Sequence, residues 1–322
     1  METELINTEK ENVLMQAGNC SVTIFPELGG KIASIRVNNR ELLQAPLAPY
    51  APRTRAMAFD EGDASGWDEC LPSVAGCTVK TAAGRASVPD HGDLWRVTWS
   101  KNRNRVAQSS NCATLLGECF SLPLALERTV ELSEAGEGWK ICLDYKLTNT
   151  GEYPSPWSWA AHPLFLAEEG DRIVLPGSIR ELRLEGSGGA RLGKNGDLVA
   201  WTLAHLSRGG TTDLSVAQGA GTGVGDKLFA GPLSANENWC ALERPRAGLR
   251  IKVGFDPAAT PYLGLWLCYG GWPDRPGPKQ TCVALEPSTA PVDSLAQAGP
   301  WSRTLSPGEC YSWRMQVEIE PI

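Results

Sequence analysis

The chain has 322 residues, of which 42% are hydrophobic, so its length allows one large domain with a sizeable core. Its formal net charge of −7 at pH 7 lacks the basic footprint of a nucleic-acid-binding protein. The absence of a run of about 18 apolar residues excludes a membrane-spanning helix, and the charged first twelve residues contain no apolar segment typical of a signal peptide, so we expect a cytoplasmic protein.

The ten cysteines are spread from Cys20 to Cys310 and carry no signature of a metal site. They include no CxxC pair and no Cys/His spacing of the kind that binds zinc. Because no export signal precedes them, we interpret them as reduced thiols that pack as small hydrophobic side chains.

Turns dominate the first hundred residues. Residues 21–25 and 31–37 are predicted strands, joined by a turn at Gly29 and Gly30. Residues 45–66 are predicted to form a loop that carries Arg53 and Arg55, which either contact ligand hydroxyls or are simply solvated. The loop contains several prolines and acidic residues.

Residues 66–74 bring an aromatic side chain next to two carboxylates, as Trp67, Asp68 and Glu69. Carboxylates bind sugar hydroxyls through charge-assisted hydrogen bonds, and an indole offers a stacking face. The alternative is a surface turn capped by acids. A second turn follows at His91 and Gly92, where the glycine would let a ligand approach the backbone closely.

Clean alternation of apolar and polar residues recurs through the rest of the chain, in residues 94–99, 128–132, 139–147, 249–255 and 311–319. This pattern indicates antiparallel strands with one buried and one wet face. The best helix candidate is short, starting at Asp293 as an N-cap and ending before Gly299. Residues 1–322 therefore read as a single all-β domain, most simply a large antiparallel β-sandwich.

Two predicted strands share one arrangement of side chains. In residues 157–165, Ser158, Ala160 and His162 fall on one face, with the indoles on the other. Proline follows immediately at residue 163, so we expect the strand to end there. His162 alone is either a proton donor or a satisfied core side chain.

Residues 281–289 repeat this arrangement, with Cys282, Ala284 and Glu286 on one face and Pro287 next. A lone buried Glu is costly. We therefore expect His162 and Glu286 to face each other across a groove.

The order of His91-Gly92, His162-Pro163 and Glu286-Pro287, with Gly29-Gly30 near the start, resembles the aldose 1-epimerase (galactose mutarotase-like) family over nearly the whole chain. Members of that family usually carry an Asn-Arg pair before the first histidine, whereas this loop reads Gly66 to Glu69. The sequence therefore resembles a divergent branch. The resemblance implies a β-supersandwich and no cofactor.

The resemblance also implies roles for three residues: Glu286 as general base, His162 as general acid and His91 as a second histidine beside the sugar. Such a pair removes the proton from O1 of a free aldose while protonating the ring oxygen, and so interconverts the α and β anomers. The reference pKa values make Glu a base at pH 7 but leave His partly protonated. We expect a nearby carboxylate to raise the pKa of His162.

Two other functions remain open: a non-catalytic carbohydrate-binding protein on the same fold, and another reaction type, such as that of a lyase or of a sugar-phosphate epimerase. Because the stretches near the predicted site are acidic, including Asp226, we expect a neutral sugar ligand, with substrate contacts from Asp68, Glu69, Trp67, Arg53 and Asp226. His205 matches no family motif and is predicted to be structural or at the surface. The sequence does not define the oligomeric state.

Overall fold

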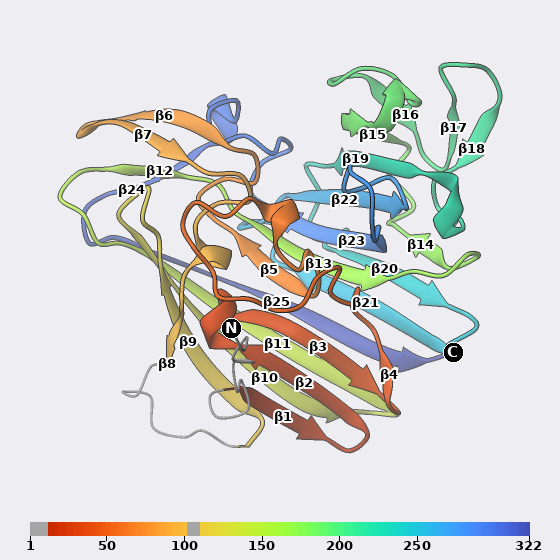
Figure 1. Cartoon of the computed structure of the whole chain (residues 1–322), viewed down its shortest axis with the longest axis horizontal. Coiled ribbons are helices and arrows are strands. Elements are labelled where there is room, and N and C mark those ends of the chain that lie inside the picture. Colours follow the sequence, from red (N-terminus) through yellow and green to blue (C-terminus); the bar gives the residue numbers. More distant parts are fainter. Residues whose placement is uncertain (1–11, 102–109) are drawn as a thin grey trace, which may run out of the picture.

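The computed structural model describes residues 12–101 and 110–322. Two large antiparallel sheets dominate them (Figure 1). The larger sheet has eleven strands in the described residues: β1 (Val13–Ala17), β2 (Cys20–Phe25), β3 (Lys31–Val37), β4 (Arg40–Glu41), β5 (Trp67–Cys70), β13 (Ala160–Leu166), β23 (Thr281–Ser288), β22 (Tyr262–Tyr269), β19 (Val224–Ala230), β15 (Glu181–Ser187) and β16 (Leu198–Ala200).

The second sheet has eight strands in the same described ranges: β14 (Arg172–Val174), β20 (Trp239–Arg244), β21 (Leu249–Phe255), β25 (Cys310–Pro321), β11 (Gly138–Asn149), β10 (Leu124–Ala135), β9 (Cys112–Glu118) and β8 (Ser100–Lys101). Three small two-stranded sheets pair β6 (Cys77–Thr81) with β7 (Gly84–Val88), β12 (Ser155–Trp157) with β24 (Arg303–Leu305), and β17 (Leu203–His205) with β18 (Thr211–Asp213). The short 3-10 turns of the described residues are η2 (Pro26–Leu28), η3 (Phe59–Glu61), η4 (Leu94–Arg96), η5 (Gly188–Ala190), η6 (Ala220–Thr222) and η7 (Gly299–Trp301).

The predicted alternation is confirmed in the second sheet. Along β10, β11 and β25, apolar side chains are buried at every second position and polar ones are more exposed. The register carries the buried set across the sheet, since Val130 pairs with Leu143 and Leu143 with Met315. A period of two in the sequence thus defines which face meets the core.

Side chains from the two sheets meet in a shared core. The Trp159 ring, just before β13, lies 5.0 Å from the ring centroids of Tyr145 on β11 and Trp313 on β25. Glu69 on β5 accepts hydrogen bonds from Arg128 on β10 and from Tyr145. These contacts, with the antiparallel sheets, confirm the predicted all-β sandwich.

Three local predictions are wrong. Residues 94–99 begin with the turn η4 instead of a strand, because Arg96 bends inward and donates hydrogen bonds to the carbonyl oxygens of Met57 and Asp90. Residues 293–298 form turns without a helix. β13 continues through Pro163 to Leu166, since its register with β5 includes Pro163 and its register with β23 resumes at Leu164.

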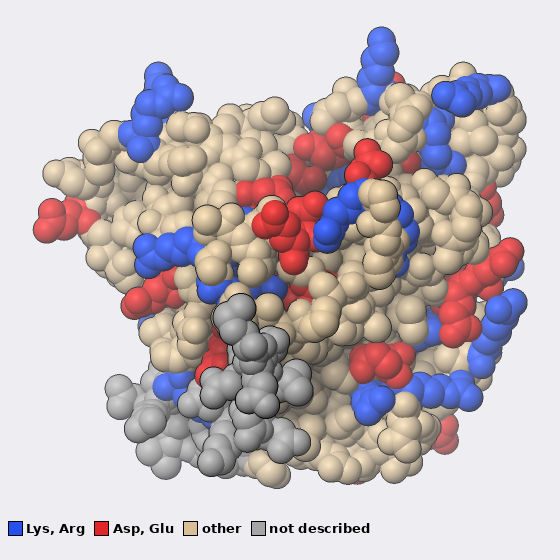
Figure 2. Space-filling model, in the orientation of Figure 1, with Lys and Arg blue, Asp and Glu red and all other residues tan. Residues whose placement is uncertain are grey.

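On the face seen in Figure 2, acidic and basic side chains are interspersed and form no continuous basic patch. Among residues 12–101 and 110–322, no helix is long and apolar enough to cross a membrane.

Candidate active site

A pocket of about 160 Å³ lies against the face of the larger sheet that points away from the second sheet. One water molecule needs about 10–15 Å³ by the same measure, so the pocket has room for a small organic ligand. Strands β13, β19, β22 and β23 supply its base, and η3 and the turn before η4 supply its walls. The lining residues are Phe59, Val74, Ala75, Asp90, His91, His162, Lys227, Trp266, Trp272, Gln280, Glu286 and Asp293.

The predicted division of side chains between two faces is confirmed for β13, with the residues just before it, and for β23. Trp159 and Ala161 belong to the core between the sheets, as do Val283 and Leu285. Cys282 and Ala284 belong to a separate small cluster, against which Trp266 and Trp272 pack. The small residues therefore leave room on the pocket face.

His162 and Glu286 lie side by side on adjacent strands of one sheet, and not across a groove as predicted. The β13–β23 register pairs Ala160 with Ser288 and Leu164 with Ala284, which puts His162 opposite Glu286. Nε2 of His162 lies 3.9 Å from Oε1 of Glu286. Both side chains are almost fully buried.

Glu286 has a cation as its direct partner. Nζ of Lys227 contacts Oε2 of Glu286 and lies 3.6 Å from Oδ1 of Asp293. Burial raises the pKa of Glu286 above its ordinary value, and the positive charge of Lys227 opposes that rise. Lys227 therefore favours the carboxylate form, which is the form able to take a proton.

The pKa of His162 is shifted in the direction opposite to the predicted one. Burial and the nearby His91, Lys227 and Lys31 lower its pKa well below 6.5. The neighbouring carboxylate does not outweigh these effects, since Lys227 already compensates its charge. His162 is therefore neutral at pH 7.

His91 reaches the pocket from a tight turn. Its Nδ1 lies 2.7 Å from Oδ2 of Asp90, its ring stacks on Phe59 with centroids 3.7 Å apart, and the His162 ring lies edge-on at 5.2 Å. Gly92 follows with φ 69°, and a Cβ there would come 2.2 Å from the carbonyl oxygen of Leu71. The glycine thus admits the protein's own backbone and not a ligand, which corrects the sequence interpretation.

The other five predicted contacts lie outside the pocket lining. Trp67, Asp68 and Glu69 form β5, which is buried throughout, and not a surface turn. Asp68 accepts a 2.5 Å hydrogen bond from Nζ of Lys31. Glu69 points into the core between the sheets.

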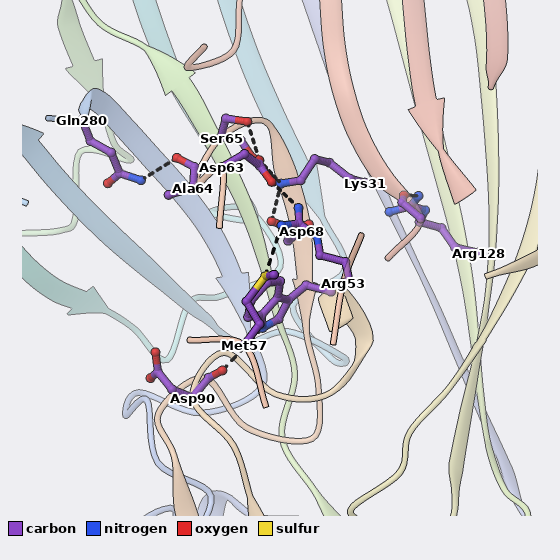
Figure 3. Close-up of polar contacts among 12 residues, drawn as sticks. Lys31, Arg53, Met57, Asp63, Ala64, Ser65, Asp68, Asp90, Arg128 and Gln280 are labelled. Carbon is purple, nitrogen blue, oxygen red and sulfur yellow. Dashed lines mark hydrogen bonds and ion pairs between the residues drawn. The ribbon is translucent and has the colours of Figure 1, made fainter. Parts of the chain in front are cut away.

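Arg53 and Asp226 are also engaged elsewhere. Arg53 pairs with Asp63, in the buried charge network shown in Figure 3, and Oδ2 of Asp226 lies 2.6 Å from Nη2 of Arg191. Asp68, Glu69, Arg53 and Asp226 therefore all have charged partners inside the protein, and Trp67 is buried beside them. None of the five lies in the pocket lining as predicted.

Sequence reasoning missed several lining residues. Lys227 alternates with Asp226 on β19, so only one of the two can face the pocket, and the carboxylate faces away. Trp266 on β22 lies opposite Lys227 in the register, a pairing that local sequence does not reveal. Phe59 comes from η3, and Trp272 and Gln280 come from the segment between β22 and β23. His205 is exposed on β17, in line with its predicted surface role.

Among the described residues, no group of three or more His, Cys, Asp or Glu side chains is arranged to hold a metal ion.

The profile of the aldose 1-epimerase family matches residues 11–318, and the chain belongs to this family. No curated protein sequence matches the chain significantly. Among solved structures, the Slr1438 protein from Synechocystis sp. PCC 6803 is 16% identical over 100% of both chains, with a TM-score of 0.70.

Two further solved structures have the same fold. A protein described as a putative aldose 1-epimerase from Escherichia coli K12 is 16% identical over 97% of this chain and 99% of its own, with a TM-score of 0.68. A galactose mutarotase-like protein from Lactobacillus casei ATCC 334 is 16% identical over 96% of this chain and 100% of its own, with a TM-score of 0.66.

Proposed function

We propose that this chain interconverts the α and β anomers of a free, uncharged aldose. The observation that carries the proposal is the placement of His162 and Glu286 opposite each other on β13 and β23, with Nε2 and Oε1 3.9 Å apart in a pocket of about 160 Å³. Family membership supports the reaction class. An acid and a base this close can reach the two oxygens bonded to one anomeric carbon.

In the proposed reaction, Oε1 of Glu286 takes the proton from O1 while C1=O1 forms and the bond from C1 to the ring oxygen breaks. His162, carrying a proton, gives it to the ring oxygen. Rotation about C1–C2 presents the other face of the aldehyde. Closure then returns one proton to His162 and the other from Glu286 to O1, so protons and electrons balance over the cycle.

Charge in the pocket supports a neutral substrate. The lining carries the carboxylates of Asp90, Glu286 and Asp293 against one ammonium group, that of Lys227. A phosphate entering this pocket would be repelled unless a cation cluster neutralised it. Arg53 pairs with Asp63, and Arg55 lies over the Phe120 ring, so neither arginine lines the pocket.

A second candidate is a carbohydrate-binding protein without turnover, because burial and nearby positive charge lower the pKa of His162 well below its ordinary value and so disfavour the protonated acid. Exchange of magnetisation between anomers by NMR separates the two candidates. Binding together with exchange supports the epimerase, whereas binding at the uncatalysed exchange rate supports the binding protein. Polarimetry of freshly dissolved aldoses gives an independent rate.

A further inference from the structure

The two oxygens of the Glu286 carboxylate have different surroundings. Oε2 contacts Nζ of Lys227. Oε1 is buried and has no hydrogen-bond partner among the described residues, and it faces Nε2 of His162. An unpartnered buried carboxylate oxygen is costly, so its place in a pocket indicates that a ligand donor satisfies it.

We propose that Lys227 is a positioning residue, which holds Oε2 of Glu286 and leaves Oε1 as the oxygen that accepts the substrate proton. This inference rests on the proposed function, because it assigns a role within that reaction. It concerns a residue outside the His–Glu pair, because Lys227 lies on β19 whereas His162 and Glu286 lie on β13 and β23.

Gly264 provides the space for this arrangement. It lies opposite Glu286 on β22, and a Cβ there would come 3.1 Å from Oε2 of Glu286 and 3.2 Å from the Phe229 ring. With no side chain at this position, Glu286 lies against the sheet and reaches toward β19. A side chain at 264 would crowd Oε2, and the carboxylate would have to shift by a few tenths of an ångström.

Lys227 is itself held from three sides. Its Nζ contacts Glu286, lies 3.6 Å from Oδ1 of Asp293, and lies 5.3 Å from the centroid of the Phe229 ring. The aromatic face adds a cation–π attraction. A lysine with this many contacts has little freedom to turn toward a ligand, so its partner is the carboxylate and not the substrate.

The charge of Lys227 acts on both members of the pair. It opposes the rise in the pKa of Glu286 that burial causes, and it contributes to lowering the pKa of His162. The titratable groups that face Glu286 are His162 on β13, Lys227 on β19, His91 in the turn before η4, Asp293 after β23, Cys70 on β5 and Cys282 on β23. Of these, Lys227 alone makes a direct ion pair with Oε2.

The test compares Lys227→Met, which removes the charge, with Lys227→Arg, which keeps it. Lys252→Met is the control, because that lysine pairs with Glu318 on the second sheet, away from the pocket. We expect the acid limb of the kcat/KM profile to move up by about 1–3 pH units in Lys227→Met, with kcat reduced more than KM is raised. Lys227→Arg should restore most of the shift, and Lys252→Met should show none.

A second readout needs no turnover. The carboxyl resonance of Glu286, identified by its loss in Glu286→Gln, should titrate at higher pH in Lys227→Met than in the wild type. An unchanged titration in a folded Lys227→Met protein overturns the positioning role, as does an unmoved acid limb. If the wild type shows no anomer exchange, the proposed function fails, while the carboxyl titration still decides whether Lys227 controls Glu286.

Discussion

His162 and Glu286 occupy opposite positions on neighbouring antiparallel strands, and each is followed by a proline, Pro163 or Pro287. Neither proline has a backbone N–H to give to the ladder. Both strands nevertheless continue past their prolines. The acid and the base therefore lie on one sheet, and their strand positions, not a mobile loop, set the distance between them.

We expect Glu286→Gln and His162→Asn each to reduce turnover by about two to four orders of magnitude, the usual range for a general acid or base. Glu286→Gln keeps the size of the side chain, whereas His162→Asn removes two ring atoms, so the melting temperature of each variant is measured to show that it is folded. His205→Gln is the matched control, because His205 is exposed on β17. Near-normal turnover in either pocket variant would remove that residue from the mechanism.

The activity of the wild type should fall as pH rises through neutrality. The pKa of His162 lies well below 6.5 because of burial and of His91, Lys227 and Lys31. Above that pKa, each pH unit reduces the protonated fraction about tenfold, and kcat/KM should follow it. Initial rates between pH 5 and 9 test this expectation. A rate that rises with pH over this range would contradict the role of protonated His162 as the acid.

Ionisation of His162 should make the stability of the folded protein change with pH in the direction opposite to activity. Below about pH 6.5 the unfolded chain binds a proton at this histidine and the folded chain does not, so folded-state stability is lost as pH falls from 6.5 toward the lowered pKa. The melting temperature of His162→Gln should therefore decline less steeply than that of the wild type over this range. His205→Gln should follow the wild-type curve, and identical slopes in all three proteins would show that His162 is not held neutral.

Glu69 should behave as a structural residue. Its oxygens bind Arg128, Tyr145 and Trp159 inside the core, and loss of one member of a buried ion pair costs about 3–5 kcal/mol. We expect Arg128→Met to destabilise the protein by this order in denaturant unfolding, and Glu69→Gln to leave KM for sugars nearly unchanged once folded.

The exposed pair of Arg314 and Asp144, with Nε and Oδ1 2.6 Å apart, provides the control for this comparison. Arg314→Met should cost no more than about 1 kcal/mol, because exposed pairs are screened by water and salt. Equal losses at the buried and exposed pairs would argue against the structural assignment of Glu69.

Local sequence predicted the fold well because strand alternation records burial directly. It assigned the pocket faces of residues 157–165 and 281–289 correctly for the same reason. It failed for Asp68, Glu69 and Asp226, since a carboxylate near a binding site and a carboxylate in a buried ion pair look alike until the partner is known. Those partners, Lys31, Arg128 and Arg191, are 37, 59 and 35 residues away along the chain.

Glucose and galactose should be preferred over their 6-phosphates. The pocket lining holds three carboxylates and one ammonium group. The excess negative charge would repel a doubly charged phosphate. Calorimetric binding of each sugar beside its 6-phosphate checks this expectation. A clear preference for the phosphates would contradict it.

The most direct measurement of the central claim is anomer exchange by NMR on a panel of free aldoses, with the wild type, Glu286→Gln and His205→Gln side by side. The account predicts exchange well above the uncatalysed rate for at least one neutral aldose with the wild type and with His205→Gln, and exchange near the uncatalysed rate with folded Glu286→Gln. Equal exchange with the wild type and Glu286→Gln would contradict it.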